Sequence, residues 1–231
     1  MINNVMNLII SAMKEELITI LNALKPTAIG KYSQIELYQK GNWLFAISKI
    51  GLVNAAMTLT ILLKDYAIKT VYNIGTVGTL KATFKPLSVL VITEAYYTFA
   101  DAQEFGYTMG QIPGELPSYY SDKKLVTTIT SKIPNIQPAV LGSSDIFIDK
   151  IEYFNHINTK FKNKIDVVDM EGCAFFQVSL KYQIPIVSIK IITDYLQATK
   201  KSSTTQFKQN LSQAGILISD LILTKLFNNK E

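Results

Sequence analysis

The chain has 231 residues, of which 48% are hydrophobic and 18% are charged. A globular chain of this length buries roughly 70–75% of the surface that its unfolded form exposes, so it can form a large hydrophobic core. The composition excludes an intrinsically disordered protein, and the lack of a short repeat excludes collagen-like and coiled-coil proteins. Because no shift in composition marks a boundary, we expect a single domain over residues 1–231.

The formal net charge is +5, and the chain contains no arginine. Its lysines are scattered, whereas a nucleic-acid-binding surface would group arginine and lysine with aromatic residues, so we expect no nucleic-acid partner. The only cysteine, Cys173, has no partner for an internal disulfide bond. The apolar run VMNLII near the N-terminus is too short for a signal peptide or a membrane span. We therefore expect a cytoplasmic protein that does not bind membranes.

Apolar runs of strand length alternate with longer segments of helical period, which predicts an α/β fold with a largely parallel sheet. A hairpin turn is expected at residues 40–42, a small-residue turn at 75–78, and a long loop from 98 to 120. The closing strand is almost wholly apolar, as a strand covered on both faces should be. In chain order we predict strands over 5–11, 35–39, 43–49, 70–75, 88–97, 138–143, 166–170 and 185–193, and helices over 14–24, 53–66, 122–132, 171–182 and 205–227.

Acidic residues follow several of these strands. Ligands of open α/β sheets bind outside the carboxyl ends of the strands, where this chain places Glu16, Asp145, Glu171 and Asp194. Ionised carboxylates only accept hydrogen bonds, so their grouping predicts recognition of hydroxyls and proton transfer. Three of these acids also have a purely structural interpretation: Glu16 as a helix-dipole partner, and Asp145 and Asp194 as N-caps. Glu171 is harder to explain structurally, because burying an unpaired charge between VVDM and GCAFF would be costly.

The remaining motifs exclude some chemistries. Backbone N–H groups of the turn Gly75-Thr76-Val77-Gly78 could approach a ligand, because glycine has no side chain to block them. Neither GxGxxG nor GxxxxGK[ST] occurs, so the turn is not a dinucleotide or Walker motif. His156 is the only histidine, and there is no cysteine cluster to complete a zinc site or a nucleophilic triad. We expect no metal and no cofactor.

Taken together, these segments resemble the nucleoside phosphorylase and nucleosidase superfamily, and most closely its 5′-methylthioadenosine/S-adenosylhomocysteine nucleosidase family. The resemblance covers nearly the whole chain and rests on IISAMKEEL, SKIGLVNAA, VYNIGTVGTL, FADAQEFGYTMGQIPG, SSDIFI, VVDMEG and IKIITD. It implies a three-layer α/β/α fold around a mixed, largely parallel twisted sheet. The implied activity is hydrolysis of the N-glycosidic bond of methylthioadenosine, adenosylhomocysteine and 5′-deoxyadenosine in methionine salvage and methyl-cycle recycling, by a homodimer.

The resemblance also implies roles for individual residues. Glu16 would hold and activate the attacking water, and Asp194, supported by Thr193, would protonate the purine at N7. Glu171 would bind the ribose diol, with Met170 against the sugar. The other implied substrate-binding residues are Phe147 and Ile148 at adenine; Met13, Ile50 and Phe207 at the alkylthio group; Thr76, Gly78, Asp169 and Lys190; and Ala102, Phe105 and Pro113 from the partner subunit.

The chain departs from the family pattern at two places. Lys190 stands where the family usually has arginine, which keeps the charge but loses the planar guanidinium. Thr79 follows the glycine-rich segment where the family has smaller residues, and is expected to narrow the sugar pocket.

Three other functions remain open. A phosphorolytic nucleoside phosphorylase would hold phosphate with arginines, which this chain lacks, so hydrolysis is favoured. A hydrolase of 6-amino-6-deoxyfutalosine would share the adenine and ribose contacts. A nucleoside-binding protein with a decayed site is disfavoured by the presence of both Glu16 and Asp194.

Overall fold

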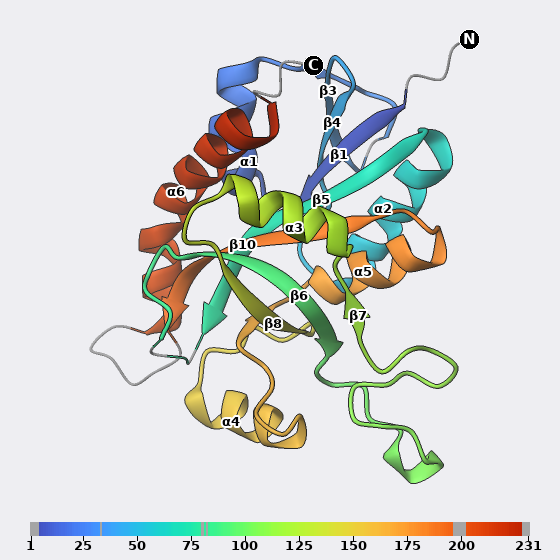
Figure 1. Ribbon diagram of the computed structural model, residues 1–231, viewed down its shortest axis with the longest axis vertical. Coiled ribbons are helices and arrows are strands. Elements are labelled where there is room, and N and C mark those ends of the chain that lie inside the picture. Colours follow the sequence, from blue (N-terminus) through green and yellow to red (C-terminus); the bar gives the residue numbers. More distant parts are fainter. Residues whose placement is uncertain (1–4, 33, 80, 82, 196–201, 228–231) are drawn as a thin grey trace.

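The computed structural model describes residues 5–32, 34–79, 81, 83–195 and 202–227. Within these residues the chain forms a ten-stranded sheet with helices on both faces (Figure 1). The strands are β1 (Met6–Ser11), β2 (Thr27–Ala28), β3 (Glu36–Lys40), β4 (Trp43–Ile47), β5 (Ile68–Thr79), β6 (Val89–Tyr97), β7 (Tyr119–Tyr120), β8 (Gln137–Ser143), β9 (Val167–Asp169) and β10 (Ile186–Tyr195). The helices are α1 (Lys14–Leu24), α2 (Leu52–Asp65), α3 (Lys123–Lys132), α4 (Ile151–Lys160), α5 (Gly172–Lys181) and α6 (Ser203–Leu221), with a 3₁₀ turn η1 (Gln103–Phe105) and a π-helical turn η2 (Ile222–Phe227).

Strand β5 is the centre of the sheet because it pairs with β1, β10 and β9. Strand β10 also pairs with β6, and β6 leads through β8 and β9 back to β5, so that these five strands close into a ring. The sheet is mixed, but its long β5–β10, β6–β8 and β1–β5 ladders are parallel, as predicted. The carboxyl ends of β1, β5 and β10 therefore meet at the same edge.

Helices cover the sheet on two sides, which gives the three layers that we expected. Leu17 of α1, Ile129 of α3 and Ile218 of α6 belong to the hydrophobic core on one face. Leu59 of α2 and Phe175 of α5 belong to the core on the other face. Helix α4 lies at one end of the molecule over a smaller third core (Figure 1). No helix in the described part of the chain is long and apolar enough to cross a membrane.

The predicted hairpin is confirmed, since β3 and β4 are antiparallel around Gly41 and Asn42, with Gly41 at a φ of +57°. The other predicted strands and helices are present within a few residues of their expected bounds. Helix α4, the turn η1 and the two-residue strands β2 and β7 were not predicted from the sequence. Helix α4 buries Phe154, Ile157 and Asn158 and has no side-chain cap, so its short apolar stripe is weak evidence of a helix.

The predicted turn over residues 75–78 is wrong: this segment is a continuous part of β5. It pairs with β10 on one side, and Gly78 also pairs with Val168 of β9 on the other. The glycines serve close packing here. A Cβ atom on Gly78 would lie 2.8 Å from Oδ2 of Asp194, and one on Gly75 would lie 3.1 Å from Nζ of Lys190. The missing side chains leave room for two charged groups.

Strand β10 has an irregularity that the sequence did not reveal. Its register against β5 shifts between Ile192 and Asp194, which leaves Thr193 as the extra residue of a bulge. Consecutive strand residues normally point to opposite faces, and a bulge re-aims them. Thr193 and Asp194 both line the same cavity as a result. Asp194 lies inside β10 and is not an N-cap, because α6 begins at Ser203 with Ser202 as its cap.

Candidate active site

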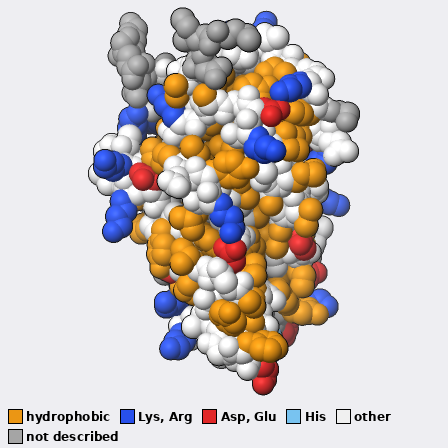
Figure 2. Space-filling model, turned by 90° about the vertical axis from the view of Figure 1, so that its right-hand side faces the viewer, with side chains coloured by type: hydrophobic (Ala, Val, Ile, Leu, Met, Phe, Trp, Pro, Cys, Tyr) orange, Lys and Arg blue, Asp and Glu red, His pale blue; other side chains and the backbone are white. Residues whose placement is uncertain are grey.

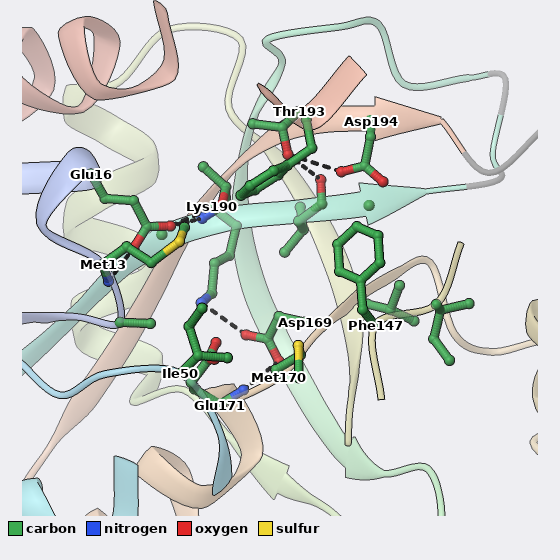
Figure 3. A pocket seen from close by; sticks show the side chains of 18 of the residues that line it. Met13, Glu16, Ile50, Phe147, Asp169, Met170, Glu171, Lys190, Thr193 and Asp194 are labelled. Carbon is green, nitrogen blue, oxygen red and sulfur yellow. Dashed lines mark hydrogen bonds and ion pairs between the residues drawn. The ribbon is translucent and has the colours of Figure 1, made fainter. Parts of the chain in front are cut away.

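A cavity of about 140 Å³ lies at the carboxyl ends of β1, β5 and β10, beside the connection from β9 to α5 (Figure 3). Segments far apart in the sequence meet in it, and most of the predicted site residues line it. These are Met13, Glu16, Ile50, Thr76, Gly78, Phe147, Ile148, Asp169, Met170, Glu171, Lys190, Thr193, Asp194 and Phe207.

Glu16 is buried, with 2% of its surface exposed, and its carboxylate is held from two sides. Oε2 accepts hydrogen bonds from the Ser11 hydroxyl and from the Met13 N–H at 3.1 Å. Oε1 accepts from the Thr76 N–H at 2.8 Å and the Thr76 hydroxyl at 2.9 Å. The contacts to Ser11 and Thr76 fix Glu16 to β1 and β5, so a helix-dipole role alone does not account for its position.

Lys190 is a buried cation among acids. It is 2% exposed, and its Nζ lies 2.9 Å from Oδ2 of Asp169. Burial alone would lower the pKa of Lys190, but the charges of Asp169 and Glu171 outweigh burial and raise it. Asp169 also accepts a hydrogen bond from the Ser143 hydroxyl at 2.6 Å. The ammonium group therefore offsets the negative charge on one wall of the cavity.

Glu171 lies on the same wall, at the start of α5. It is 7% exposed, and the Gly51 N–H donates a hydrogen bond of 3.0 Å to its Oε1. Burial, together with the charge of Asp169, raises the pKa of Glu171. Asp145, in contrast, accepts a hydrogen bond of 2.7 Å from the Leu52 N–H and does not line the cavity. It therefore stabilises the start of α2 rather than a helix after Ser144, which corrects its predicted N-cap role.

Asp194 is at the other end of the cavity from Glu16 (Figure 3). It is 2% exposed, and burial raises its pKa to about 6. The Thr193 hydroxyl donates a hydrogen bond of 3.0 Å to Oδ1, which lowers the pKa and partly offsets the effect of burial. A carboxyl group with such a pKa holds a proton for part of the time near neutral pH. Asp194 is thus suited to act as a general acid.

Apolar side chains form the mouth of the cavity. Phe147 is 42% exposed and meets Phe207 edge-to-face, with 6.1 Å between the ring centroids. Ile50, on the connection before α2, is 48% exposed. An acidic interior with an aromatic and aliphatic mouth fits a ligand with a flat ring, hydroxyl groups and an apolar end.

Three predicted residues lie elsewhere. Ala102, Phe105 and Pro113 belong to the segment 98–118, which extends away from the sheet, and they do not line the cavity (Figure 1). Phe105 is 83% exposed. Their expected contribution to a partner subunit's site stays a prediction.

Three residues that support the site were not predicted from the sequence. Ser11 bonds to Glu16, and Ser143 bonds to Asp169. Asn73 lines the cavity and accepts a hydrogen bond of 2.7 Å from the Ser188 hydroxyl. Ser11 and Asn73 stand within motifs that we singled out, but only the pairing of β1, β5 and β10 shows which of their neighbours they touch. Among the described residues, no group of three or more His, Cys, Asp or Glu side chains is arranged to hold a metal ion.

Comparisons with known proteins identify the family of this chain. A sequence model of the phosphorylase superfamily matches residues 8–227. The 5′-methylthioadenosine/S-adenosylhomocysteine nucleosidase of Buchnera aphidicola is 31% identical over 230 residues, which cover 96% of this chain and 90% of that protein. The chain belongs to this nucleosidase family of the phosphorylase superfamily.

Solved structures show the same fold. The nucleosidase of Colwellia psychrerythraea, in complex with adenine, has a TM-score of 0.88 at 24% identity and covers 97% of this chain and 95% of its own. A futalosine hydrolase mutant of Helicobacter pylori also has a TM-score of 0.88, at 20% identity, covering 96% of this chain and 99% of its own. The predicted nucleoside phosphorylase-like fold is confirmed, and the fold alone does not separate these activities.

Replacing Gly78 by alanine is expected to lower kcat by about 10-fold to 100-fold, with a smaller change in KM. The new methyl group would lie 2.8 Å from the Asp194 carboxyl and displace it, and a shift of about 1 Å in a reacting group can cost about 10²-fold. Steady-state kinetics check this. Gly30→Ala is the matched control, because a Cβ there meets nothing within 4 Å. Equal activity of both variants would contradict the role of Gly78.

Replacing Lys190 by methionine is expected to destabilise the fold by about 3–5 kcal/mol, because the buried carboxylate of Asp169 would lose its counter-charge. Chemical denaturation measures this difference in unfolding free energy. Lys181→Met removes an exposed ion pair with Glu115, at 2.7 Å, and should cost no more than about 1 kcal/mol. If both variants lose the same small amount, the cavity does not depend on Lys190 for charge balance.

Proposed function

We propose that this enzyme hydrolyses the N-glycosidic bond of 5′-methylthioadenosine and S-adenosylhomocysteine, and also of 5′-deoxyadenosine, and releases adenine. The observation that carries the proposal is the placement of two buried acids, Glu16 and Asp194, at opposite ends of one cavity. Breaking this bond leaves positive charge on the ribose and negative charge on adenine. A proton donor at the base and carboxylates at the sugar oppose both charges as they develop.

Asp194 is proposed to protonate adenine at N7, which makes adenine a better leaving group. Its raised pKa, about 6, supports this role. Glu16 is proposed to hold and activate the water that attacks the ribose carbon. Its two oxygens already accept hydrogen bonds from Ser11, Met13 and Thr76, which fix its orientation before substrate arrives. Fixed groups of this kind need no reorganisation during the reaction.

The other predicted residues are proposed to position the substrate. Glu171 would accept hydrogen bonds from the ribose diol, with Met170 against the sugar, and Lys190 would balance the acids on that wall. Phe147 would stack on adenine while the Ile148 backbone reads its edge. Met13, Ile50 and Phe207, which all line the cavity, would surround the alkylthio group.

The reaction is tested by measuring released adenine with and without phosphate and a chelator. We expect methylthioadenosine to give adenine and methylthioribose at the same rate in all conditions. A product that appears only with phosphate, as methylthioribose-1-phosphate, would assign the enzyme to the phosphorylases. Parallel assays with adenosylhomocysteine, 5′-deoxyadenosine and 6-amino-6-deoxyfutalosine rank the 5′ substituents. No turnover of any substrate would leave a nucleoside-binding protein.

We also propose that residues 1–231 act as a single nucleosidase domain, and the expected cytoplasmic location stays a prediction. We further propose that two copies of the chain form a homodimer. Hydrophobic side chains gather on the face that carries α2, α5 and the segment 98–118 (Figure 2). Among them, Val53 is 75% exposed, Phe105 83% and Leu116 50%. Exposed apolar surface of this kind marks an interface.

Sedimentation at micromolar concentration is expected to give a dimer, and Val53→Lys should shift it towards monomer. Lys64→Gln, at the end of the same helix, is a control expected to leave the dimer unchanged. A wild-type monomer with full activity would contradict both the interface and the contribution of Ala102, Phe105 and Pro113 to the partner's site.

A further inference from the structure

A second cavity, of about 640 Å³, lies at the opposite end of the sheet from the catalytic cavity. It is bordered by the amino ends of β1, β4 and β5, by α3 and by the last residues of η2. Binding sites for small molecules commonly have volumes of about 300–1,000 Å³. Its size therefore suits a small organic ligand.

Three residues that are neighbours across adjacent strands line this cavity. Asn7 of β1 pairs with Trp43 of β4 on one side and with Thr70 of β5 on the other. Asn7 and Thr70 are each 8% exposed, and all three residues line the cavity. The side chains of Asn7 and Thr70 make no hydrogen bond to another described residue. Neither side chain is among the fully buried polar groups without a partner in the described part of the chain, so the carboxamide and the hydroxyl keep access to the cavity and are available to a ligand.

The walls add positive charge and aromatic surface. Lys40, Lys69 and Lys132 line the cavity, and none of its described lining residues is Asp or Glu. Trp43 stacks on Phe227, with 4.7 Å between ring centroids and 26° between planes. A multivalent oxyanion suits three ammonium groups together with an amide and a hydroxyl, because each can donate to one of its oxygens. A flat ring suits the aromatic wall.

We propose that this cavity binds a phosphate ester that carries an aromatic or heteroaromatic ring, of about the size of a nucleoside monophosphate. The phosphate lies among the three lysines, and the ring lies against the aromatic wall that Trp43 forms with Tyr72 and Phe227. The catalytic cavity is a poor alternative for such a ligand, because Glu16, Asp169, Glu171 and Asp194 line it and Lys190 is already paired. The proposal does not depend on the nucleosidase activity.

The chain contains one tryptophan, so Trp43 reports on this cavity without labelling. Phenyl phosphate is the probe, titrated into the full-length protein with adenine present at saturation to occupy the catalytic cavity. We expect a saturable change in tryptophan fluorescence. Phenol, which lacks the charge, and inorganic phosphate, which lacks the ring, should each need at least about tenfold higher concentration.

Variants then test the location. Lys69→Gln and Lys132→Gln should each weaken phenyl phosphate binding about threefold, and together about tenfold or more, with less binding at high salt. Lys124→Gln removes an exposed lysine of α3 that does not line the cavity, and should change nothing. Circular dichroism checks that the variants fold. No saturable signal, a signal lost when adenine is added, or equal affinity in all variants would overturn the proposal.

Discussion

Replacing Asp194 by asparagine is expected to lower turnover of methylthioadenosine by about 10²–10⁴-fold, which is the usual contribution of a general acid. The amide keeps the shape of the side chain but has no acidic proton to give to adenine. Binding should suffer less, because Phe147 and Glu171 remain in place. Steady-state kinetics separate the two effects. Asp220→Asn, at an exposed position on α6, is the matched control and should keep full activity.

The pH dependence of turnover offers a second measurement on the wild type and Asp194→Asn. Wild-type turnover is expected to fall as the pH rises above about 6, because Asp194 loses its proton there, and the residual rate of Asp194→Asn should lack this step. Turnover within about threefold of wild type would place the proton donor elsewhere.

The same substitution is expected to raise stability. The pKa of Asp194 is higher in the folded protein than its ordinary value of 3.8, so ionisation above pH 6 costs folding free energy through the buried charge. Asp194→Asn should therefore melt at a higher temperature than wild type above pH 6. The difference should vanish below about pH 3, where the carboxyl group is protonated in both the folded and unfolded states. Thermal melts across this range check the sign.

Replacing Glu16 by glutamine is expected to lower turnover by about 10²–10⁴-fold as well, because an amide cannot take a proton from water. It should also destabilise the fold by about 1–3 kcal/mol. Both carboxylate oxygens accept backbone N–H groups, from Met13 and Thr76. A glutamine NH₂ must therefore face one of these donors and leave it without a partner. Activity is measured well below the melting temperature of the variant.

Glu15→Gln is the matched control for Glu16, since both acids lie in the first turn of α1 and Glu15 is exposed. A helix-dipole role would give both variants the same small loss of stability and normal turnover. Full activity of Glu16→Gln would remove Glu16 from the proposed mechanism and leave the water without an assigned base.

The sequence by itself determined the fold class and the identity of most cavity residues. Alternation of apolar runs with helical periods predicts the strands, because strands buried on both faces must be apolar throughout. The rule that ligands bind at the carboxyl ends of parallel strands pointed to Glu16, Glu171 and Asp194, which line the cavity, and also to Asp145, which does not. The resemblance then added residues such as Phe147 and Phe207, which periodicity alone would assign to ordinary packing.

The tertiary structure decided what periodicity cannot describe. Residues 75–78 look like a turn because glycine favours turns, yet they continue β5 and pair with β10. Glycine is needed there for another reason, because the Asp194 carboxyl and the Lys190 ammonium groups occupy the space that side chains would fill. The bulge at Thr193 depends on the register between β10 and β5, which no local signal sets. The raised pKa of Asp194 comes from burial by segments distant in the chain. Local propensity acts within a few residues, whereas register, burial and charge pairing are properties of the packed chain.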